Sequence, residues 1–449
     1  MKGSRREFIE GASIGALGLA LARPRASGAE EKPAAPSDRV RFGVVGCNGM
    51  GWADMHSALQ TKGVECVALA DVDQSVLDKR AKDAAEAGGR APKLYRDYRK
   101  LLEDRDVDAV IVGTPDHWHC LVLTDALAAG KHVYVEKPLA NSIGEARAML
   151  AAARRAGRVV QVGQWQRSAP QYAQALKIVR SGALGNIRLV KVWAYQGWMK
   201  PVPVKPDGPA PVGVDYDMWL GPAPKRPFNP NRFHFTFRWF WDYAGGLMTD
   251  WGVHEIDIAL WVMDAKAPRS VTASGGKLAY PDDASETPDT LQAVFEYDGF
   301  NMLWEHATGI DGGNYGRTEG IAFIGNNGTL VVNRGGLELV PETADAEEGK
   351  LPRYRMEAIP SYRQPRDVDA LDLHTRNFVD AIRKNDPSTL ACGIESGSVA
   401  AINAHMGNIS YKVGRKVHWD AAAGAFKDDA EASALIAPAY HNGWKQPTA

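Results

Sequence analysis

Cysteine is scarce in this chain, and its few cysteines are far apart. Four occur in 449 residues, at Cys47, Cys66, Cys120 and Cys392, with no C-x-x-C spacing. This pattern excludes a small disulfide-stabilised scaffold and offers no cysteine cluster for a metal. We therefore expect no structural disulfide and no cysteine-held metal.

A charge excess of either sign is also missing. The chain carries 53 basic and 54 acidic side chains, which gives a formal net charge of -1. No overall field favours nucleic acid or an anionic membrane surface, so we expect no nucleic acid and no membrane partner of that kind.

The apolar stretch near the start, residues 9–22, is short and rich in glycine and alanine. It is too short for a comfortable membrane span. It follows Ser4-Arg5-Arg6-Glu7-Phe8-Ile9, which resembles the twin-arginine export motif. The small residues Ser27-Gly28-Ala29 favour cleavage, which predicts a signal peptide over residues 1–29 and a linker over 30–38. An uncleaved anchor is the alternative.

The resemblance implies a periplasmic or otherwise exported protein that leaves by the twin-arginine route. Its partner would then be the export machinery for folded proteins, which allows a cofactor to be loaded before export.

The full chain is 45% hydrophobic and contains 45 glycines, which suits two or three packed domains. A strand at 40–45 leads into Gly46-Cys47-Asn48-Gly49-Met50-Gly51 and then a helical pattern. This order places free helix amides where a pyrophosphate binds, so we expect Gly46, Asn48, Gly49, Met50 and Gly51 to hold a dinucleotide. Asn48 replaces a glycine, and we expect it to tolerate positive φ there.

Asp71 closes a second strand, about twenty residues after the glycine loop. A carboxylate at this position accepts hydrogen bonds from the adenosine ribose and repels a 2'-phosphate, which favours NAD over NADP. The alternative is an ordinary turn residue before the next helix.

Two further strands end in polar loops. One loop is Thr114-Pro115-Asp116-His117-Trp118-His119 and the other is Glu136-Lys137-Pro138. Ligands of open α/β sheets bind beyond the carboxyl ends of the strands. The expected cofactor contacts in these loops are Thr114, Pro115, His117, His119, Glu136 and Lys137.

These motifs, in this order, resemble the Gfo/Idh/MocA family, which includes glucose-fructose oxidoreductase and inositol dehydrogenase. The resemblance extends from Val40 to Asp420. It implies an α/β protein with a Rossmann domain, assigned here to residues 39–163, and a substrate domain, assigned to 164–420. Residues 421–449 are expected to form a C-terminal tail.

The second domain shows a strand pattern at 187–198 and shorter patterns between residues 270 and 333, with glycine and asparagine turns. We expect an open, mostly antiparallel sheet that also supports a homo-oligomer. Two helical stretches at 368–413 are expected to return to the nucleotide domain.

The chemistry of this domain concentrates around Asp250, His254 and Asp257, whose spacing predicts one shared helix face. A metal site is one use, but no second histidine has ligand spacing, so we expect no metal. General acid-base catalysis is the other use of this helix face, because histidine titrates near neutrality and a nearby lysine polarises a hydroxyl. The family's Lys-Asp-His arrangement implies catalytic roles for Lys137, Asp250 and His254. A core histidine is the alternative for His254.

Trp165 and Arg167 follow the last strand of the first domain. They are expected to contact substrate with His254, unless they are ordinary surface residues. The aromatic run over residues 232–241 is expected to line the cleft or an oligomer contact.

The leading prediction is an NAD-dependent dehydrogenase that acts on a secondary hydroxyl of a sugar, cyclitol or glycoside. A glycoside hydrolase that works by oxidation, elimination and reduction is the second reading, and a tightly bound NAD would favour it. A non-catalytic nucleotide-binding protein is the third, and the presence of Lys137, Asp250 and His254 together argues against it.

Overall fold

The computed structural model describes residues 38–88, 90–344 and 353–448. The predicted signal peptide and residues 30–37 of the predicted linker lie outside these ranges. Within them, no helix is long and apolar enough to cross a membrane.

The first domain is built on a six-stranded parallel sheet in the order β3-β2-β1-β4-β5-β6. Its strands are β1 (Val40–Val45), β2 (Val64–Ala70), β3 (Lys93–Tyr95), β4 (Ala109–Val112), β5 (His132–Val135) and β6 (Val160–Val162). The connecting helices are α1 (Gly49–Ala58), α2 (Gln74–Gly88), α3 (Tyr98–Leu102), α4 (His119–Ala128) and α5 (Ile143–Ala156). The central strands are valine-rich and buried, as parallel strands covered on both faces require.

The strand order reverses beside β1, where β2 lies on one side and β4 on the other. In a doubly wound sheet of this kind the ligand crevice opens at the carboxyl ends of the strands next to the reversal. The fold therefore brings the loops after β1, β2, β4 and β5 to one edge.

The second domain contains a ten-stranded sheet in the order β14-β13-β12-β11-β7-β10-β9-β8-β15-β16. The strands are β7 (Ile187–Gln196), β8 (Ser270–Gly276), β9 (Thr290–Glu296), β10 (Asn301–Thr308), β11 (Glu319–Gly325), β12 (Gly328–Asn333), β13 (Gly336–Pro341), β14 (Tyr362–Arg363), β15 (Val417–Asp420) and β16 (Ala425–Phe426). The pair β7 and β10 is parallel, and the other paired neighbours run antiparallel. The predicted fold class, a Rossmann domain followed by a mostly antiparallel open sheet, is confirmed.

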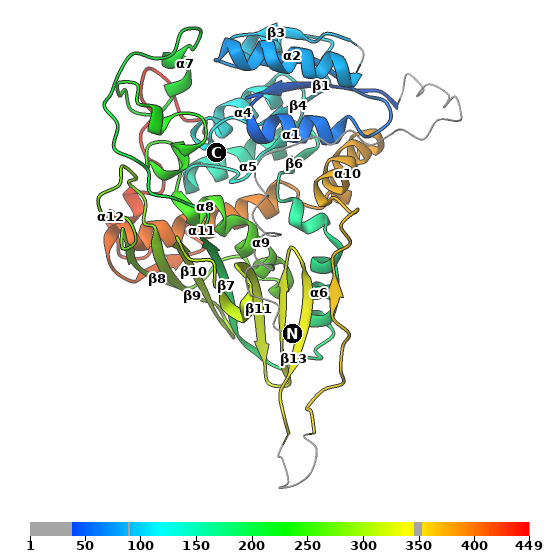
Figure 1. Ribbon diagram of the computed structural model, residues 1–449, viewed down its shortest axis with the longest axis vertical. Coiled ribbons are helices and arrows are strands. Elements are labelled where there is room, and N and C mark those ends of the chain that lie inside the picture. The colour runs from blue at the N-terminus through cyan, green and yellow to red at the C-terminus, as the bar shows by residue number, and fades with distance from the viewer. Residues whose placement is uncertain (1–37, 89, 345–352, 449) are drawn as a thin grey trace, which may run out of the picture.

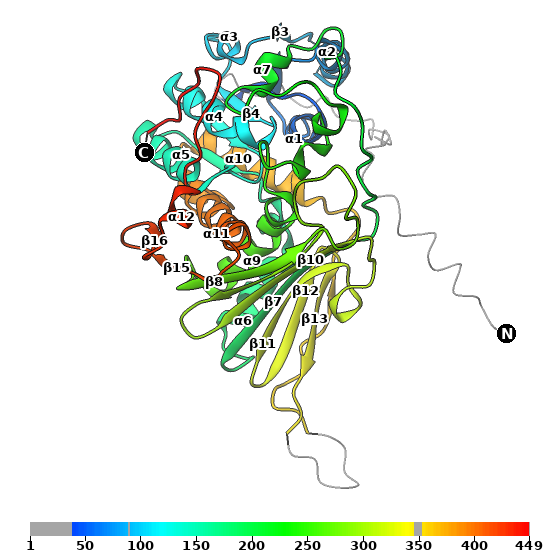
Figure 2. The same ribbon diagram turned by 90° about the vertical axis from the view of Figure 1, so that its left-hand side faces the viewer.

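Helices cover one face of this sheet (Figures 1 and 2). They are α6 (Pro170–Arg180), α9 (Gly252–Met263) and α11 (Ile394–Val413). Their apolar sides pack with Phe295, Trp304 and Phe323 of the strands into the largest core of the molecule. The opposite face leaves Leu189 and Val340 about half exposed. Oligomer formation through this face stays a prediction.

The helical stretch expected to return to the nucleotide domain forms α10 (Ala370–Lys384) and α11. From α10, Asp372 accepts a hydrogen bond from Ser57 of α1 at 2.7 Å, and the His374 carbonyl accepts one from Gln161 at 2.7 Å. A helix of the second domain that lies far along the chain thus packs against the first domain.

Residues 421–448 do not form the expected C-terminal tail. They form α12 (Ala430–Ala434) and then an arm that packs on the first domain. The Tyr440 hydroxyl donates to the Glu145 carboxylate, and the Trp444 indole lies edge-on against Trp118 at 4.9 Å. Partial burial of the Tyr440 and Trp444 rings, with these contacts, fixes the path of the arm.

A long connection between β7 and α8 (Gly246–Asp250) is named here the crossing segment, residues 197–245. It carries α7 (Tyr216–Leu220) and two short 3-10 turns, and it reaches up to the nucleotide domain beside α2 (Figure 1). There the Gln74 amide donates to the Gly213 carbonyl, and the Asp215 amide donates to the Val72 carbonyl. Its aromatic residues form a small core of their own, which includes Trp219, Phe233 and Tyr243.

Candidate active site

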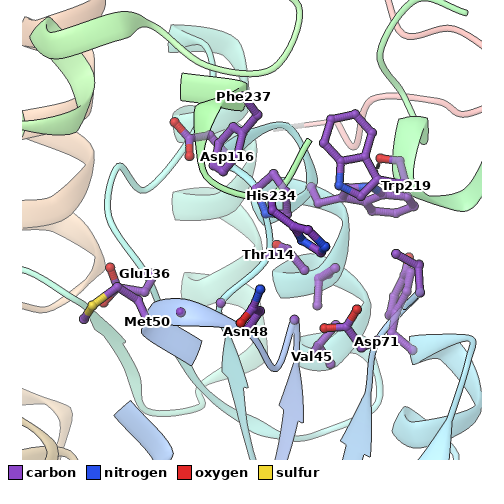
Figure 3. Close-up of a pocket in the computed structure, with 18 of the residues that line it drawn as sticks. Val45, Asn48, Met50, Asp71, Thr114, Asp116, Glu136, Trp219, His234 and Phe237 are labelled. Carbon is purple, nitrogen blue, oxygen red and sulfur yellow. Dashed lines mark hydrogen bonds between the residues drawn. The ribbon is translucent and has the colours of Figure 1, made fainter. Parts of the chain in front are cut away.

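A cavity of about 250 Å³ lies at the carboxyl edge of the parallel sheet. Its first wall comes from the loops after β1, β2, β4 and β5, and includes Val45, Gly46, Asn48, Gly49, Met50, Asp71, Thr114, Pro115, Asp116, Glu136 and Lys137. Its second wall comes from the crossing segment. Figure 3 shows Trp219, His234 and Phe237 on the opposite side of the cavity from Val45, Asn48 and Asp71.

The glycine loop fits a dinucleotide phosphate. A Cβ at Gly46 would lie 2.6 Å from the Thr114 amide nitrogen, and one at Gly51 would lie 2.0 Å from the Gly46 carbonyl oxygen. Only glycine permits this close packing of loop, helix start and β4. The first amides of α1 remain available to an anion, which is the arrangement that a pyrophosphate needs.

Asn48 corrects a detail of the sequence argument. Its φ is -89°, so it is extended backbone and not left-handed. The positive φ values belong to Gly46, at 79°, and Gly49, at 49°. Asparagine is tolerated at position 48 because the turn does not require positive φ there.

Asp71 lies at the end of β2 and borders the cavity. Its carboxylate accepts hydrogen bonds from the Cys47 amide at 2.8 Å and from the Asp73 amide at 3.0 Å. Burial raises the pKa of Asp71, against the lowering by these amides. The two bonds fix the carboxylate at the place where the adenosine ribose is expected, and its contact with that ribose stays a prediction.

The two histidines of the loop after β4 lie outside the cavity, as does Gly51. His117 Nε2 lies 3.0 Å from the Trp219 carbonyl, while His119 contacts the carbonyls of Pro138 and Thr114 at 2.8 and 2.9 Å. Burial lowers the pKa of each histidine to about 4, so both rings are neutral. This corrects the expectation that His117 and His119 contact the cofactor: they hold neighbouring loops in place.

Lys137 joins the two domains at the cavity wall. Its Nζ lies 2.8 Å from Asp250 Oδ1 and 2.9 Å from the Asp250 carbonyl oxygen. Arg238 of the crossing segment also donates to Asp250 Oδ1, at 3.2 Å. Burial favours a neutral Asp250, but Lys137 and Arg238 outweigh it and lower the pKa of this carboxyl. The structure therefore brings the predicted Lys137 and Asp250 together as an ion pair.

His254 lies beyond this pair, on α9. The helix expected to run through Asp250 and His254 is two helices, α8 and α9, which meet at Trp251. The His254 ring is 5% exposed and packs edge-on against Trp165, with ring centroids 5.8 Å apart. Its Nδ1 has no hydrogen-bond partner among the described residues. Burial, with Lys137 and Arg334 nearby, lowers its pKa well below the usual value, so the imidazole is neutral.

Glu136 lies directly before Lys137 and also borders the cavity. Burial raises its pKa to about 7, and the buried Asp54 of α1 lies beside it with a raised pKa of its own. Two carboxyl groups this close cannot both ionise easily, so the pair favours a state in which at least one of them is protonated. The expected role of Glu136 in cofactor binding stays a prediction.

Arg167 corrects another expectation. Its guanidinium donates two hydrogen bonds to Asp257, at 2.7 and 2.8 Å, and lies over the Trp261 ring. The side chains of this pair are 8% and 2% exposed. Arg167 is therefore part of the domain core and does not reach a substrate, while Asp257 has the structural role that balances it.

Trp165 packs against the His254 ring. The Arg334 guanidinium lies between Trp165 and Trp251, at 4.6 and 4.3 Å from the ring centroids. Arg334 belongs to the turn between β12 and β13, where the sequence offered no signal.

Two more residues of the site were missed. Asp116 borders the cavity, and burial raises its pKa to about 7 against the lowering effect of Arg238 and Lys137. Arg238 lies in the aromatic run whose sequence predicted either a cleft wall or an oligomer contact. His234, Phe235, Phe237 and Arg238 line the cavity, so the run does line the cleft. No group of three or more His, Cys, Asp or Glu side chains that could hold a metal occurs among the described residues.

The fold and the glycine loop define a dinucleotide-dependent enzyme. Residues 40–164 match a model described as an oxidoreductase family with an NAD-binding Rossmann fold, and residues 168–306 match the C-terminal α/β domain of the same family. The chain belongs to the Gfo/Idh/MocA oxidoreductase family. This confirms the predicted family, an oxidoreductase activity and NAD as the cofactor.

Individual relatives have low sequence identity to this chain or match only part of it. An uncharacterized oxidoreductase of Bacillus subtilis is 24% identical over 81% of this chain and 92% of its own length. An inositol 2-dehydrogenase of Rubrobacter xylanophilus is 34% identical over 38% of this chain and 46% of its own. A glycosyl hydrolase family 109 protein of Shewanella pealeana is 30% identical over 42% of this chain and 45% of its own. The match therefore spans less than half of the latter two proteins.

Among solved structures, a levoglucosan dehydrogenase in complex with NADH and levoglucosan superposes with a TM-score of 0.61 at 18% identity. The superposition covers 85% of this chain and 99% of that protein. At this identity the likeness shows the shared fold.

Proposed function

We propose that this protein oxidises a secondary hydroxyl of a sugar, cyclitol or glycoside, or reduces the matching ketone. The observation that carries the proposal is the Lys137 ammonium, which borders the dinucleotide cavity and lies 2.8 Å from Asp250 of the other domain. The inositol 2-dehydrogenase relative supports the class of substrate.

Bound NAD supplies the hydride acceptor for this reaction. The chain's own residues polarise the reacting hydroxyl and accept its proton. Lys137 donates two hydrogen bonds to Asp250, and an ammonium has three donors, so one remains for a substrate oxygen. This contact polarises the hydroxyl, and the neutral His254 imidazole next to Lys137 can accept the proton. Asp250 holds the Lys137 side chain in place.

The test is a single-turnover measurement. In Lys137→Ala and His254→Ala, we expect the protein to stay folded and to bind NAD, as followed by nicotinamide fluorescence, with a melting temperature lowered by loss of the ion pair or of the buried ring. Reduction of bound NAD by a panel of sugars should fall by about 10²- to 10⁴-fold, because a positioned acid-base group is lost. Near-parental hydride transfer in a folded variant would remove that residue from the mechanism.

A second candidate is glycoside hydrolysis by oxidation, elimination and reduction. The family 109 relative favours it, and so does Asp116, a carboxyl group at the cavity with a pKa near 7 that could exchange a second proton. Deuterium in D2O separates the two. Elimination requires loss of the proton on the carbon next to the ketone, so a hydrolase incorporates solvent deuterium there and releases the aglycone, whereas a simple dehydrogenase does neither.

We also propose that the protein is exported by the twin-arginine route, on the basis of Arg5 and Arg6 before the apolar stretch. Replacement of both by lysine should leave the precursor in the cytoplasm, as seen by cell fractionation. Normal arrival of the double-lysine protein in the periplasm would show that another signal operates.

A further inference from the structure

A second cavity, of about 210 Å³, lies apart from the dinucleotide site. It is enclosed by four parts of the chain that are far apart in the sequence. These are the start of α5, the crossing segment, α11 and the C-terminal arm, which runs from α12 to the side of α5 (Figure 2). The two cavities share no lining residue, and the proposed reaction uses no residue of the second.

Two sides of the second cavity are apolar. Pro222, Ala223 and Pro224 of the crossing segment form one side, and Leu435 and Pro438 of the arm form the other. The ring of each proline fixes its φ angle, which limits how far these walls can deform. Small-molecule sites combine such apolar walls with a few polar groups that orient the ligand.

The first polar groups come from α11, where His405, Asn408 and Lys412 lie three and four residues apart and therefore on one helix face. His405 is 7% exposed, and its Nε2 donates to the Ala140 carbonyl at 2.9 Å. Burial lowers the pKa of this ring to about 4, so it is neutral, and Nδ1 keeps a lone pair that no described residue uses. The Asn408 amide nitrogen donates to the Gly245 carbonyl, while its Oδ1 has no partner in the described part of the chain.

The cavity also has unused hydrogen-bond donors. Asn141 donates its backbone amide to Glu145 at 2.8 Å, but its side-chain amide bonds to none of the described residues. The exposed Lys412 side chain places Nζ 3.9 Å from the centroid of the Trp241 ring. Its ammonium makes no hydrogen bond or ion pair with the residues that the structure describes, so all three donors are available.

The charges around the cavity disfavour an ionic ligand. The Glu145 carboxyl accepts a hydrogen bond from the Tyr440 hydroxyl, and Asp242 pairs with Arg226 at 2.8 Å. An anion would approach both of these acids, whereas a cation would meet the Lys412 ammonium. A neutral ligand with hydroxyl groups avoids both costs, because each hydroxyl can donate to one partner and accept from another.

We propose that the second cavity binds a neutral polyhydroxylated ring, a sugar or cyclitol, through Asn141, His405 and Lys412. Its hydroxyls donate to His405 Nδ1 and accept from the Asn141 amide and the Lys412 ammonium, and its C–H face lies against the apolar walls. No bond is made or broken at this site. The proposal does not depend on the proposed function, because no residue of the reacting site takes part.

The experiment uses the full protein loaded with NADH and methyl glucoside as the probe. This glycoside has no carbonyl group that NADH could reduce, so binding is measured without turnover. We expect slower amide hydrogen exchange, by mass spectrometry, in peptides that cover residues 140–146, 405–412 and 435–441. Protection only in peptides around Lys137 and His254, or no protection at any concentration, would overturn the proposal.

The charge of the ligand gives a second test. The methyl glycosides of glucuronate and glucosamine keep the ring and add a negative or a positive charge. From the concentration dependence of the protection, each should bind about tenfold more weakly than methyl glucoside, because each meets a like charge. A glucuronate glycoside that binds more tightly than the neutral one would show that the cavity is an anion site instead.

Variants of the two donors test the assignment of residues. Asn141→Ala and Lys412→Met should each weaken methyl glucoside by about 3- to 10-fold, because a hydrogen bond to the ligand is lost. The melting temperature should stay near that of the parent, because neither side chain bonds to another described residue. Lys427→Met, at an exposed lysine that lines neither cavity, is the matched control. Unchanged affinity in both donor variants would refute the site.

The two proposals fail in different ways. Binding of methyl glucoside in the second cavity by a protein that transfers hydride to no sugar would count against the proposed function alone. Hydride transfer without protection at the second cavity would count against this site alone.

Discussion

Two ion pairs lie in the same region of the molecule, and they differ in how deeply their side chains are buried. Lys137 with Asp250 lies at the cavity wall, with side chains 12% and 16% exposed. Arg167 with Asp257 lies deeper, with side chains 8% and 2% exposed and a tryptophan against the guanidinium. Both acids follow the crossing segment and lie about two helical turns apart, yet only the first pair borders the cavity, through Lys137.

The difference shows that residue type and spacing do not separate a charge that borders the cavity from one that is buried in the domain core. Arginine offers a rigid fork that both oxygens of Asp257 satisfy, and it stays charged at any ordinary pH. Lysine offers a compact charge with a donor to spare and can lose a proton when its surroundings change. Exposure to the cavity decides which chemistry is used.

The largest expected effect comes from making the two pairs alike. Lys137→Arg keeps the positive charge beside Asp250 but introduces a group that does not give up a proton, and its planar fork no longer fits a single substrate oxygen. We expect hydride transfer in a single turnover to fall by about 10²- to 10⁴-fold with little change in melting temperature. Arg167→Lys is the matched control and should keep most of the activity. Comparable loss of activity in both would show that the two pairs do the same work.

Arg167→Met tests the structural pair directly. It leaves the buried Asp257 without a counter-charge, so the free energy of unfolding should fall by about 3–5 kcal/mol in urea denaturation. Arg167→Met combined with Asp257→Leu removes both charges and should recover most of that loss, because a buried ion pair can often be replaced by apolar side chains. A single variant as stable as the parent would return Arg167 to the substrate candidates.

The same contrast explains what could be predicted from the sequence. The nucleotide side is built from local strand-loop-helix units, so Gly46, Asp71 and Lys137 were placed correctly at one sheet edge by periodicity and by the rule for strand ends. Burial of Arg167 by Asp257 and Trp261 is a tertiary fact that no local pattern records. The same holds for Arg334, which reaches Trp165 and Trp251 from a turn far along the chain.

The fold follows the same division. The long alternating strand β7 is predicted at 187–198 and observed at Ile187–Gln196, whereas β14 and β16 are two residues long and exist only because their neighbours pair with them. The C-terminal arm carries no strong periodicity, and its order comes from the contacts of Tyr440 and Trp444 with the first domain.

His374 sharpens the comparison on the structural side, because it is fully buried near Arg167 and has no access to the cavity. Burial lowers its pKa to about 4, so the folded protein favours the neutral ring. The stability from this histidine is present above its unfolded pKa of about 6.5 and is lost as the pH falls toward 4; the loss at pH 5 is about 2 kcal/mol. His374→Gln should lose about 2 kcal/mol less than the parent between pH 7.5 and pH 5, in urea denaturation at each pH. Equal losses would show that His374 does not titrate in this way.

Asp71 is the intermediate case, and it gives the smallest effect. Its carboxylate is held by two backbone amides, as a structural residue would be, yet it borders the cavity, as a binding residue would. Asp71→Ser should weaken NAD binding because the loop loses the hydrogen bonds between the backbone amides and this carboxylate. The absolute affinity for NAD therefore does not test whether Asp71 contacts the ribose. The ratio of NADP to NAD affinity does, because only a carboxylate facing the ribose repels a 2'-phosphate. We expect this ratio to rise by about tenfold, or roughly 1.4 kcal/mol, in fluorescence titrations. Asp78→Ser, at an exposed acid on α2, is the control and should leave the ratio unchanged. A parent that binds NADP as tightly as NAD would place Asp71 with Asp257, as a carboxylate that serves only the fold.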